Sequence, residues 1–120
     1  MIAVSSDTQE ISKQARKETY ERVLAIVEKN TGGEQQALVS DFVVRQIATQ
    51  AGMYGPQVIK AICAAATNGD LLRWQGKLAR TDEESLLAII EDEVEKDHPR
   101  HLLIAECNKR LDSIRNGGDE

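Results

Sequence analysis

The chain has 120 residues, of which 41% are hydrophobic, and a formal net charge of -5 at pH 7. This length supports one globular domain with a hydrophobic core and is short for two. No apolar run approaches the roughly 20 residues that a membrane span needs, and residues 1–10 lack the pattern of a signal peptide. Cys63 and Cys107 have no closely spaced cysteine partner, so neither a disulfide framework nor a cysteine-rich zinc site is suggested. We therefore expect a cytoplasmic protein with two buried, reduced thiols.

The charges are unevenly distributed along the chain. Residues 1–40 carry five basic and six acidic side chains, residues 41–80 carry five and two, and residues 81–120 carry five and twelve. The overall charge argues mildly against nucleic acid, because phosphates are held mainly by lysine and arginine. The middle third nevertheless has a local charge of +3. Such asymmetry can place a positive face on an acidic protein.

Hydrophobic periodicity divides the chain into helices and strands. Apolar residues recur at three- and four-residue steps in five stretches, as on the buried face of an amphipathic helix. Two short extended runs flank Gly76, which is typical of a tight hairpin. In chain order we expect a flexible segment 1–11, a helix over 12–29, a strand stub within 37–39, helices over 41–51 and 56–67, strands over 71–75 and 77–80, a helix that residues 81–84 open, and a last helix over about 100–115.

Local capping signals support these boundaries. Ser12 and Ser40 are suited to cap the first and second helices, because a serine hydroxyl accepts hydrogen bonds from free backbone N–H groups. Pro56 is the residue type favoured at the first position of a helix. Thr81 and Glu84 have the spacing of a capping box, so we expect their side chains to begin the fourth helix.

The order helix, short strand, helix, tight turn, helix, hairpin and helix resembles the winged helix-turn-helix family over roughly residues 13–96. The residues that carry the resemblance are Val39-Ser40, Ile47-Ala48, Gly52, Val58, Ile62, residues 68–72 and the hairpin 73–80. The resemblance implies a mainly α fold, with a three-helix core, a short β-hairpin wing and two additional C-terminal helices. It divides the chain into a flexible N-terminus 1–11, a winged-helix domain 12–97, a C-terminal helix 98–116 and a flexible tail 117–120.

The third helix is the candidate recognition helix. Its inward stripe is expected to consist of Val58, Ile59, Ile62, Ala65 and Ala66. The outward face then consists of Gln57, Lys60, Ala61, Ala64 and Thr67. This face has one base and no acid, so nothing on it would repel DNA. Glutamine pairs with adenine and lysine reaches guanine or a phosphate, whereas the alanines either contact thymine methyl groups or merely favour the helix.

Side chains around this helix complete the candidate DNA interface. Arg45 on the second helix and Arg73 and Lys77 on the hairpin could hold the phosphate backbone on either side of a groove. The resemblance implies that the tip of the wing touches phosphate or the minor groove. The tyrosine in the turn before the third helix either packs or bonds a phosphate. The candidate DNA contacts are Arg45, Tyr54, Gln57, Lys60, Ala61, Arg73, Gln75 and Lys77.

The last helix has an apolar stripe of its own. A winged-helix body normally needs one extra helix to complete its core, so this stripe is expected to form a homodimer contact. The alternative is that the helix covers its own domain. The candidate dimer residues are Leu103, Ile104, Cys107, Leu111 and Ile114.

Together these features predict a sequence-specific protein that binds double-stranded DNA and regulates transcription, without enzymatic activity, cofactor, metal or membrane association. One alternative is a winged helix that binds only protein, which the acidic last third of the chain favours. Another is a KH-like domain that binds single-stranded nucleic acid through the GxxG pattern of residues 52–55.

Overall fold

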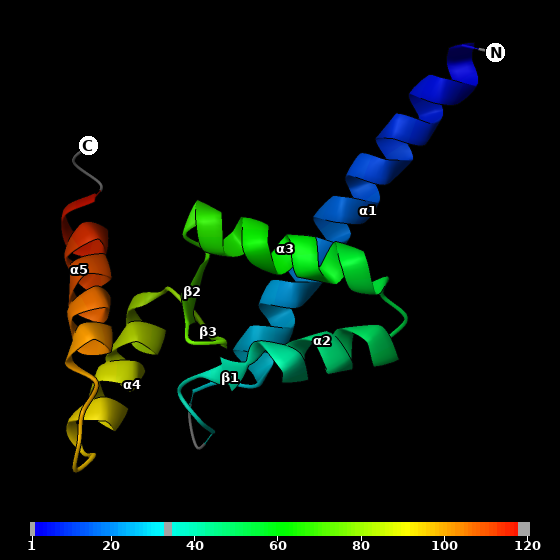
Figure 1. The fold of residues 1–120 in the computed structure, drawn as a ribbon. Coiled ribbons are helices and arrows are strands. Elements are labelled where there is room, and N and C mark those ends of the chain that lie inside the picture. Colours follow the sequence, from blue (N-terminus) through cyan, green and yellow to red (C-terminus); the bar gives the residue numbers. More distant parts are fainter. Residues whose placement is uncertain (1, 33–34, 118–120) are drawn as a thin grey trace.

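The computed structural model describes the backbone of residues 2–32 and 35–117 and the side chains of residues 13–32 and 35–116. This part of the chain is mainly helical and contains a small antiparallel sheet (Figure 1). Its elements are α1 (Ile2–Lys29), β1 (Val39–Ser40), α2 (Asp41–Gln50), α3 (Gly55–Asn68), β2 (Leu71–Trp74), β3 (Lys77–Arg80), α4 (Glu83–Val94) and α5 (His101–Gly117). None of the helices in the described ranges is both long enough and apolar enough to cross a bilayer.

The first helix is longer than expected. It begins at Ile2, so the cap predicted at Ser12 and the irregular segment predicted for residues 1–11 are wrong for residues 2–11. No glycine or proline interrupts the chain between Ile2 and Lys29, and the ladder of backbone hydrogen bonds can therefore continue. Figure 1 shows the N-terminal half of α1 extending away from the other elements. Of the predicted tail 117–120, only Gly117 lies within the described residues, and it belongs to α5.

The cap at the start of α2 and the cap at the end of α3 are local in sequence. The Ser40 hydroxyl accepts a hydrogen bond of 3.1 Å from the backbone N–H of Phe42, which confirms the predicted cap of α2. Gly69 ends α3 in the left-handed region, at φ +87°, where a residue without Cβ is not strained.

The predicted capping box of α4 is wrong, because the capping residue is Asp82. Its carboxylate accepts hydrogen bonds from the backbone N–H of Ser85 at 3.3 Å and from the Ser85 hydroxyl at 2.7 Å. The Thr81 hydroxyl instead donates to the carbonyl oxygen of Gly69 at 2.8 Å. Thr81 therefore ties the start of α4 to the end of α3.

The three strands form an antiparallel sheet in the order β1-β3-β2. The pairs Val39↔Leu78 and Leu72↔Ala79 set the register of β3 against its two neighbours. At the hairpin tip, Gln75 has φ 48° and Gly76 has φ 78°. Two successive positive φ angles are the geometry of the two-residue turn that suits the twist of a β-hairpin, and the predicted hairpin is therefore confirmed.

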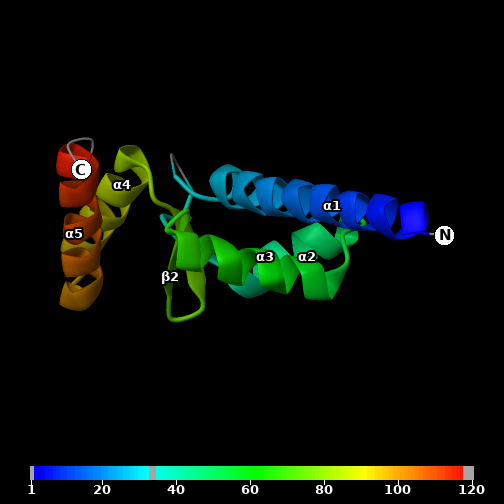
Figure 2. The same ribbon diagram turned by 90° about the horizontal axis from the view of Figure 1, so that it is seen from above.

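The hairpin separates two hydrophobic cores. Leu71 and Leu78 point into a first core with residues of α1, α2 and α3, including Val23, Val27, Val44, Val58 and Ile62. Their neighbours Leu72 and Ala79 point into a second core with α4 and α5, which contribute Leu86, Ile89, Leu103, Cys107 and Leu111. Successive side chains of a strand alternate between its faces, so one hairpin serves both cores. Figure 2 shows the hairpin between the group α1–α3 and the pair α4 and α5.

The second core uses most of the apolar stripe that was predicted to form a dimer contact on the last helix. Leu103, Cys107 and Leu111 are buried against α4 and the hairpin of the same chain. Ile104 is half-buried and Ile114 is exposed. The prediction assumed that one extra helix completes the fold, whereas the second face of the hairpin needs both helices to cover it. The alternative that the last helix covers its own domain therefore agrees with the structure.

A buried carboxylate joins the end of α4 to the start of α5. Glu93 accepts hydrogen bonds from Lys96 Nζ at 2.6 Å, from Arg100 Nη2 at 2.8 Å and from the backbone N–H of Arg100 at 2.9 Å. The Arg100 guanidinium, above all, and then Lys96 lower the pKa of Glu93 to about 2, against the opposing effect of burial. The charge of Glu93 is thus fully compensated, and it fixes the turn that folds α5 back onto α4.

Candidate nucleic-acid interface

The buried side of α3 differs from the predicted inward stripe by a rotation about the helix axis. Val58, Ile62 and Ala65 are buried, as predicted. Ala61, predicted to face outward, is 7% exposed and belongs to the first core, whereas Ile59, predicted to face inward, is 46% exposed. Helix α1 packs along this side of α3, and the small side chain of Ala61 allows the two helices to approach closely. Ala61 is therefore removed from the candidate DNA contacts.

The exposed face of α3 combines small, apolar and polar side chains. It carries one base and no acid, and consists of Pro56, Ile59, Lys60, Cys63, Ala64, Thr67 and Asn68. The exposure of Cys63 contradicts the prediction of two buried thiols; only Cys107 is buried, and burial raises the pKa of its thiol to about 11. We call this exposed face of α3 the recognition face.

On one side of the recognition face lies a shallow groove with two arginines. The groove has a volume of about 180 Å³ and is lined by Asp41, Arg45, Ile59, Ile62 and Arg73. Asp41 Oδ2 lies 3.3 Å from Arg73 Nη2, and Asp41 Oδ1 lies 3.7 Å from Arg45 Nη2. Arg73 also reaches the recognition face, where its Nη1 lies 3.6 Å from Cys63 Sγ. One carboxylate thus holds two arginines beside α3 and leaves a local charge of +1.

The hairpin tip is fixed to the start of α2. The backbone N–H of Asp41 donates to the carbonyl oxygen of Gly76 at 2.9 Å, and Lys77 pairs in register with Ser40. Gln75 and Lys77 are both exposed at this tip. The structure therefore brings the hairpin tip, with Gln75 and Lys77, next to the start of α2.

On the other side of the recognition face, α1 and α3 border a second cleft. It has a volume of about 270 Å³ and is lined by Arg16, Tyr20, Gln57, Lys60, Ala61 and Ala64. Gln57 and Lys60 thus lie toward α1, away from Arg45 and Arg73. The sequence did not predict Arg16, because the acids outnumber the bases in residues 1–40. Its spacing of three, four and seven residues from Thr19, Tyr20 and Val23 indicates the inward side of the first helix.

Tyr54 stands apart from both groups. It occupies the turn before α3, where its side chain makes no capping hydrogen bond and is 67% exposed. Of the two alternatives given for Tyr54, the packed position is therefore wrong. The preceding loop residue Met53 is the one that packs against the first core.

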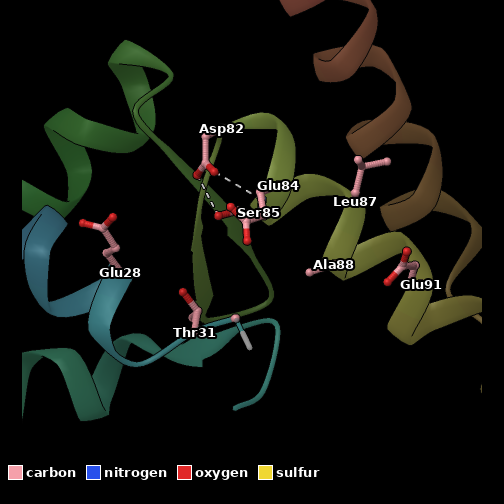
Figure 3. A pocket seen from close by; sticks show the side chains of 9 residues that line it. Glu28, Thr31, Asp82, Glu84, Ser85, Leu87, Ala88 and Glu91 are labelled. Carbon is pink, nitrogen blue, oxygen red and sulfur yellow. Dashed lines mark hydrogen bonds between the residues drawn. The ribbon is translucent and has the colours of Figure 1, made fainter. Parts of the chain in front are cut away.

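A larger cleft between the end of α1 and α4 has the opposite charge. It has a volume of about 500 Å³ and is lined by Glu28, Thr31, Gly32, Asp82, Glu84, Ser85, Leu87, Ala88 and Glu91 (Figure 3). The carboxylate of Asp82 is engaged by Ser85, and that of Glu28 lies 3.4 Å from Arg80 Nη1. Such a surface repels phosphate, so the basic and acidic parts of the chain are separated in the structure as they are in the sequence.

The described residues contain no group of three or more histidine, cysteine, aspartate or glutamate side chains that could hold a metal ion. Comparisons of the chain with models of protein families, with curated proteins and with solved structures found no match.

Proposed function

We propose that this protein is a winged-helix domain that binds duplex DNA sequence-specifically and regulates transcription, with α3 in the major groove. The recognition face carries the proposal, because it has no acid and has basic side chains on both sides. Arg45 and Arg73 lie on one side of it, and Lys60 and Arg16 on the other. The major groove of B-DNA is about 12 Å wide and admits an α-helix, and the phosphate backbones bordering the groove attract such cations.

The geometry revises which side chains would read base edges. Ile59, Cys63 and Thr67 occupy the exposed part of α3, between the two basic groups. Apolar groups and the threonine methyl suit the methyl group of thymine, and the threonine hydroxyl can bond either a donor or an acceptor on a base edge. We therefore assign base contacts to these residues in place of Ala61.

The hairpin serves as the wing in this proposal. Its hydrogen bond to Asp41 holds Lys77 at a fixed distance from α2, which suits contact with a phosphate beside the groove. Lys77 lies on the opposite face of the hairpin from Arg73, because it pairs with Trp74 whereas Arg73 pairs with Leu78. If Arg45, Arg73 and Lys77 each contact a phosphate, log affinity falls with log salt concentration with a slope of about −3 or steeper. The proposal includes no dimer contact through Leu103, Cys107 and Leu111, which the chain's own core occupies.

Fluorescence anisotropy with random duplex, selected duplex and single-stranded DNA at several salt concentrations tests the proposal. We expect duplex to bind more tightly than single strand, with the stated salt dependence. Cys63 provides a second test, because a maleimide should alkylate this exposed thiol and leave buried Cys107 unmodified. Duplex should slow the alkylation of Cys63, and single-stranded DNA at equal concentration should not. Duplex binding that leaves the alkylation rate unchanged would place DNA elsewhere and refute the role of α3.

A winged helix that binds only protein is the second candidate. It is favoured by the acidic cleft, in which Leu87 is exposed between Glu84 and Glu91 (Figure 3). An apolar side chain between carboxylates suits a basic, amphipathic segment of a partner. This candidate predicts no measurable duplex binding and no protection of Cys63.

A KH-like domain is favoured less by the geometry. A KH sheet requires a long first strand, whereas β1 has two residues. Tighter binding to single-stranded DNA than to duplex in the same anisotropy measurement would support this alternative instead.

A further inference from the structure

The cleft between α1 and α3 has the chemistry of an anion site. Two of its six lining side chains, Arg16 and Lys60, are cations, and Gln57 adds an amide that can donate hydrogen bonds. The described residues that line the cleft include no carboxylate. Its remaining walls are Tyr20 and two alanines, and an apolar wall strengthens the attraction between cations and an anion because it excludes water.

The hydroxyl of Tyr20 forms hydrogen bonds with residues at the C-terminal end of α3 and just beyond it. It donates to Asp70 Oδ2 at 2.5 Å and accepts from Asn68 Nδ2 at 3.2 Å. Burial and the hydrogen bond to Asp70 raise the pKa of Tyr20, so the phenol stays neutral. Tyr20 thus contributes a wall to the cleft and no negative charge, and it keeps the Asp70 carboxylate engaged.

The placement of the cleft relative to the recognition face indicates which anion it suits. Ile59 lines the groove of Arg45 and Arg73, whereas Lys60, the next residue, lines the cleft of Arg16. The two basic groups therefore lie on opposite sides of one helix. A helix in a major groove has a phosphate backbone along each side, so a duplex that meets Arg45 and Arg73 with one strand brings its other strand toward Arg16 and Lys60.

We propose that the α1–α3 cleft is a phosphate-binding site in which Arg16 and Lys60 hold a backbone phosphate of duplex DNA. This assignment rests on the proposed function. The planar guanidinium of Arg16 can donate two parallel hydrogen bonds to one phosphate, and the ammonium of Lys60 adds a second charge. The first helix thereby becomes part of the proposed DNA interface.

Duplex binding by Arg16→Ala, Lys60→Ala and the control Arg22→Ala, at several salt concentrations, tests this site. Arg22 is exposed on the same helix and does not line the cleft, so the control removes the same charge from α1. We expect Arg16→Ala and Lys60→Ala each to reduce the salt slope by about 1 and to weaken selected and random duplex by the same factor, about five- to tenfold at low salt. Arg16→Lys should restore part of the loss, and circular dichroism should show unchanged thermal unfolding in all variants.

The cleft could bind a free phosphate compound and not a DNA backbone phosphate. A second measurement distinguishes these two ligands. Inorganic phosphate and pyrophosphate are titrated into the ¹⁵N-labelled full chain while the Nε–H resonance of Arg16 is followed by NMR. If wild type binds duplex and Arg16→Ala behaves like Arg22→Ala, the phosphate site is wrong and the proposed function stands. If wild type binds no duplex, the proposed function is wrong. In that case, a change in the Arg16 resonance on adding phosphate, lost in Lys60→Ala, would support the cleft as a site for free phosphate. If phosphate causes no such change, the cleft is not a phosphate site.

Discussion

Replacing Glu93 by glutamine should loosen the docking of α5. The substitution keeps the size of the side chain but removes the charge that Lys96 and Arg100 surround, and it turns an amide N–H₂ group toward those two donors. Glu93 is fully buried, so water cannot replace the lost interaction. Because Glu93 connects the end of α4 to the backbone just before α5, the second hydrophobic core should lose its fixed arrangement.

The pKa of Glu93 gives the size of the effect. Lowering the pKa from 4.5 to about 2 corresponds to about 3 kcal/mol of stability at neutral pH. Since the folded pKa lies below the unfolded one, this contribution is complete above pH 4.5 and is lost as pH falls toward 2. The linkage predicts a loss of about 1 kcal/mol by pH 4 and about 2 kcal/mol by pH 3. Lys96 and Arg100, whose pKa values Glu93 raises, stay protonated throughout.

Urea unfolding followed by tryptophan fluorescence measures this effect, because Trp74 is the single tryptophan and packs against the second core. We expect Glu93→Gln to lower the urea midpoint by about 1 to 2 M at pH 7. The control is Glu106→Gln, which removes a partly exposed pair with Arg110 of 2.8 Å on α5 and should cost about 1 kcal/mol or less. The difference between wild type and Glu93→Gln should shrink at pH 4. A midpoint no lower than that of the control, or a difference that is the same at pH 4 and pH 7, would refute the role assigned to Glu93.

The remaining predictions concern α3 and the DNA interface. Ala61→Leu should destabilise the fold by about 1 to 3 kcal/mol because it overfills the contact with α1, whereas Ala64→Leu on the exposed side should change the urea midpoint little. Equal midpoints would contradict the observed rotation of α3. Asp41→Asn should strengthen duplex binding about fivefold, because it frees Arg45 and Arg73 from two surface ion pairs that together are worth about 1 kcal/mol. Weaker binding would show that Asp41 positions these arginines for DNA and does not compete with it. Lys77→Ala should weaken binding to all duplex sequences alike and reduce the salt slope by about 1, and a loss confined to one sequence would assign Lys77 a base contact.

Local features of this fold could be predicted because their causes lie within a few residues. The Ser40 hydroxyl caps α2 through the N–H two residues later, and the two-residue turn at Gly76 sets the hairpin by its own backbone angles. Where two local signals competed, the prediction failed. Thr81 and Asp82 both have capping side chains, and the choice of Asp82 depends on Gly69, whose carbonyl engages Thr81 from twelve residues away in sequence.

The proposed DNA interface was also predicted only in part. The sequence indicated that α3 has an acid-free face and that bases surround it, because charge and helical period are properties of the chain itself. It could not decide whether Ala61 or Ile59 lies inside, since an alanine suits either environment and the outcome depends on where α1 crosses α3. Arg16 lies in the candidate site because α1 crosses α3 beside Lys60, and the sequence does not determine this crossing.

The sequence alone thus determined the order of the helices and strands, the hairpin and the separation of charge, each of which depends on neighbouring residues. The tertiary structure decided which partner covers each apolar stripe. The stripe of Leu103, Cys107 and Leu111 is equally suited to a second copy and to the chain's own hairpin, because the hydrophobic effect has no direction. The second face of the hairpin, with Leu72 and Ala79, supplies that partner within the same chain.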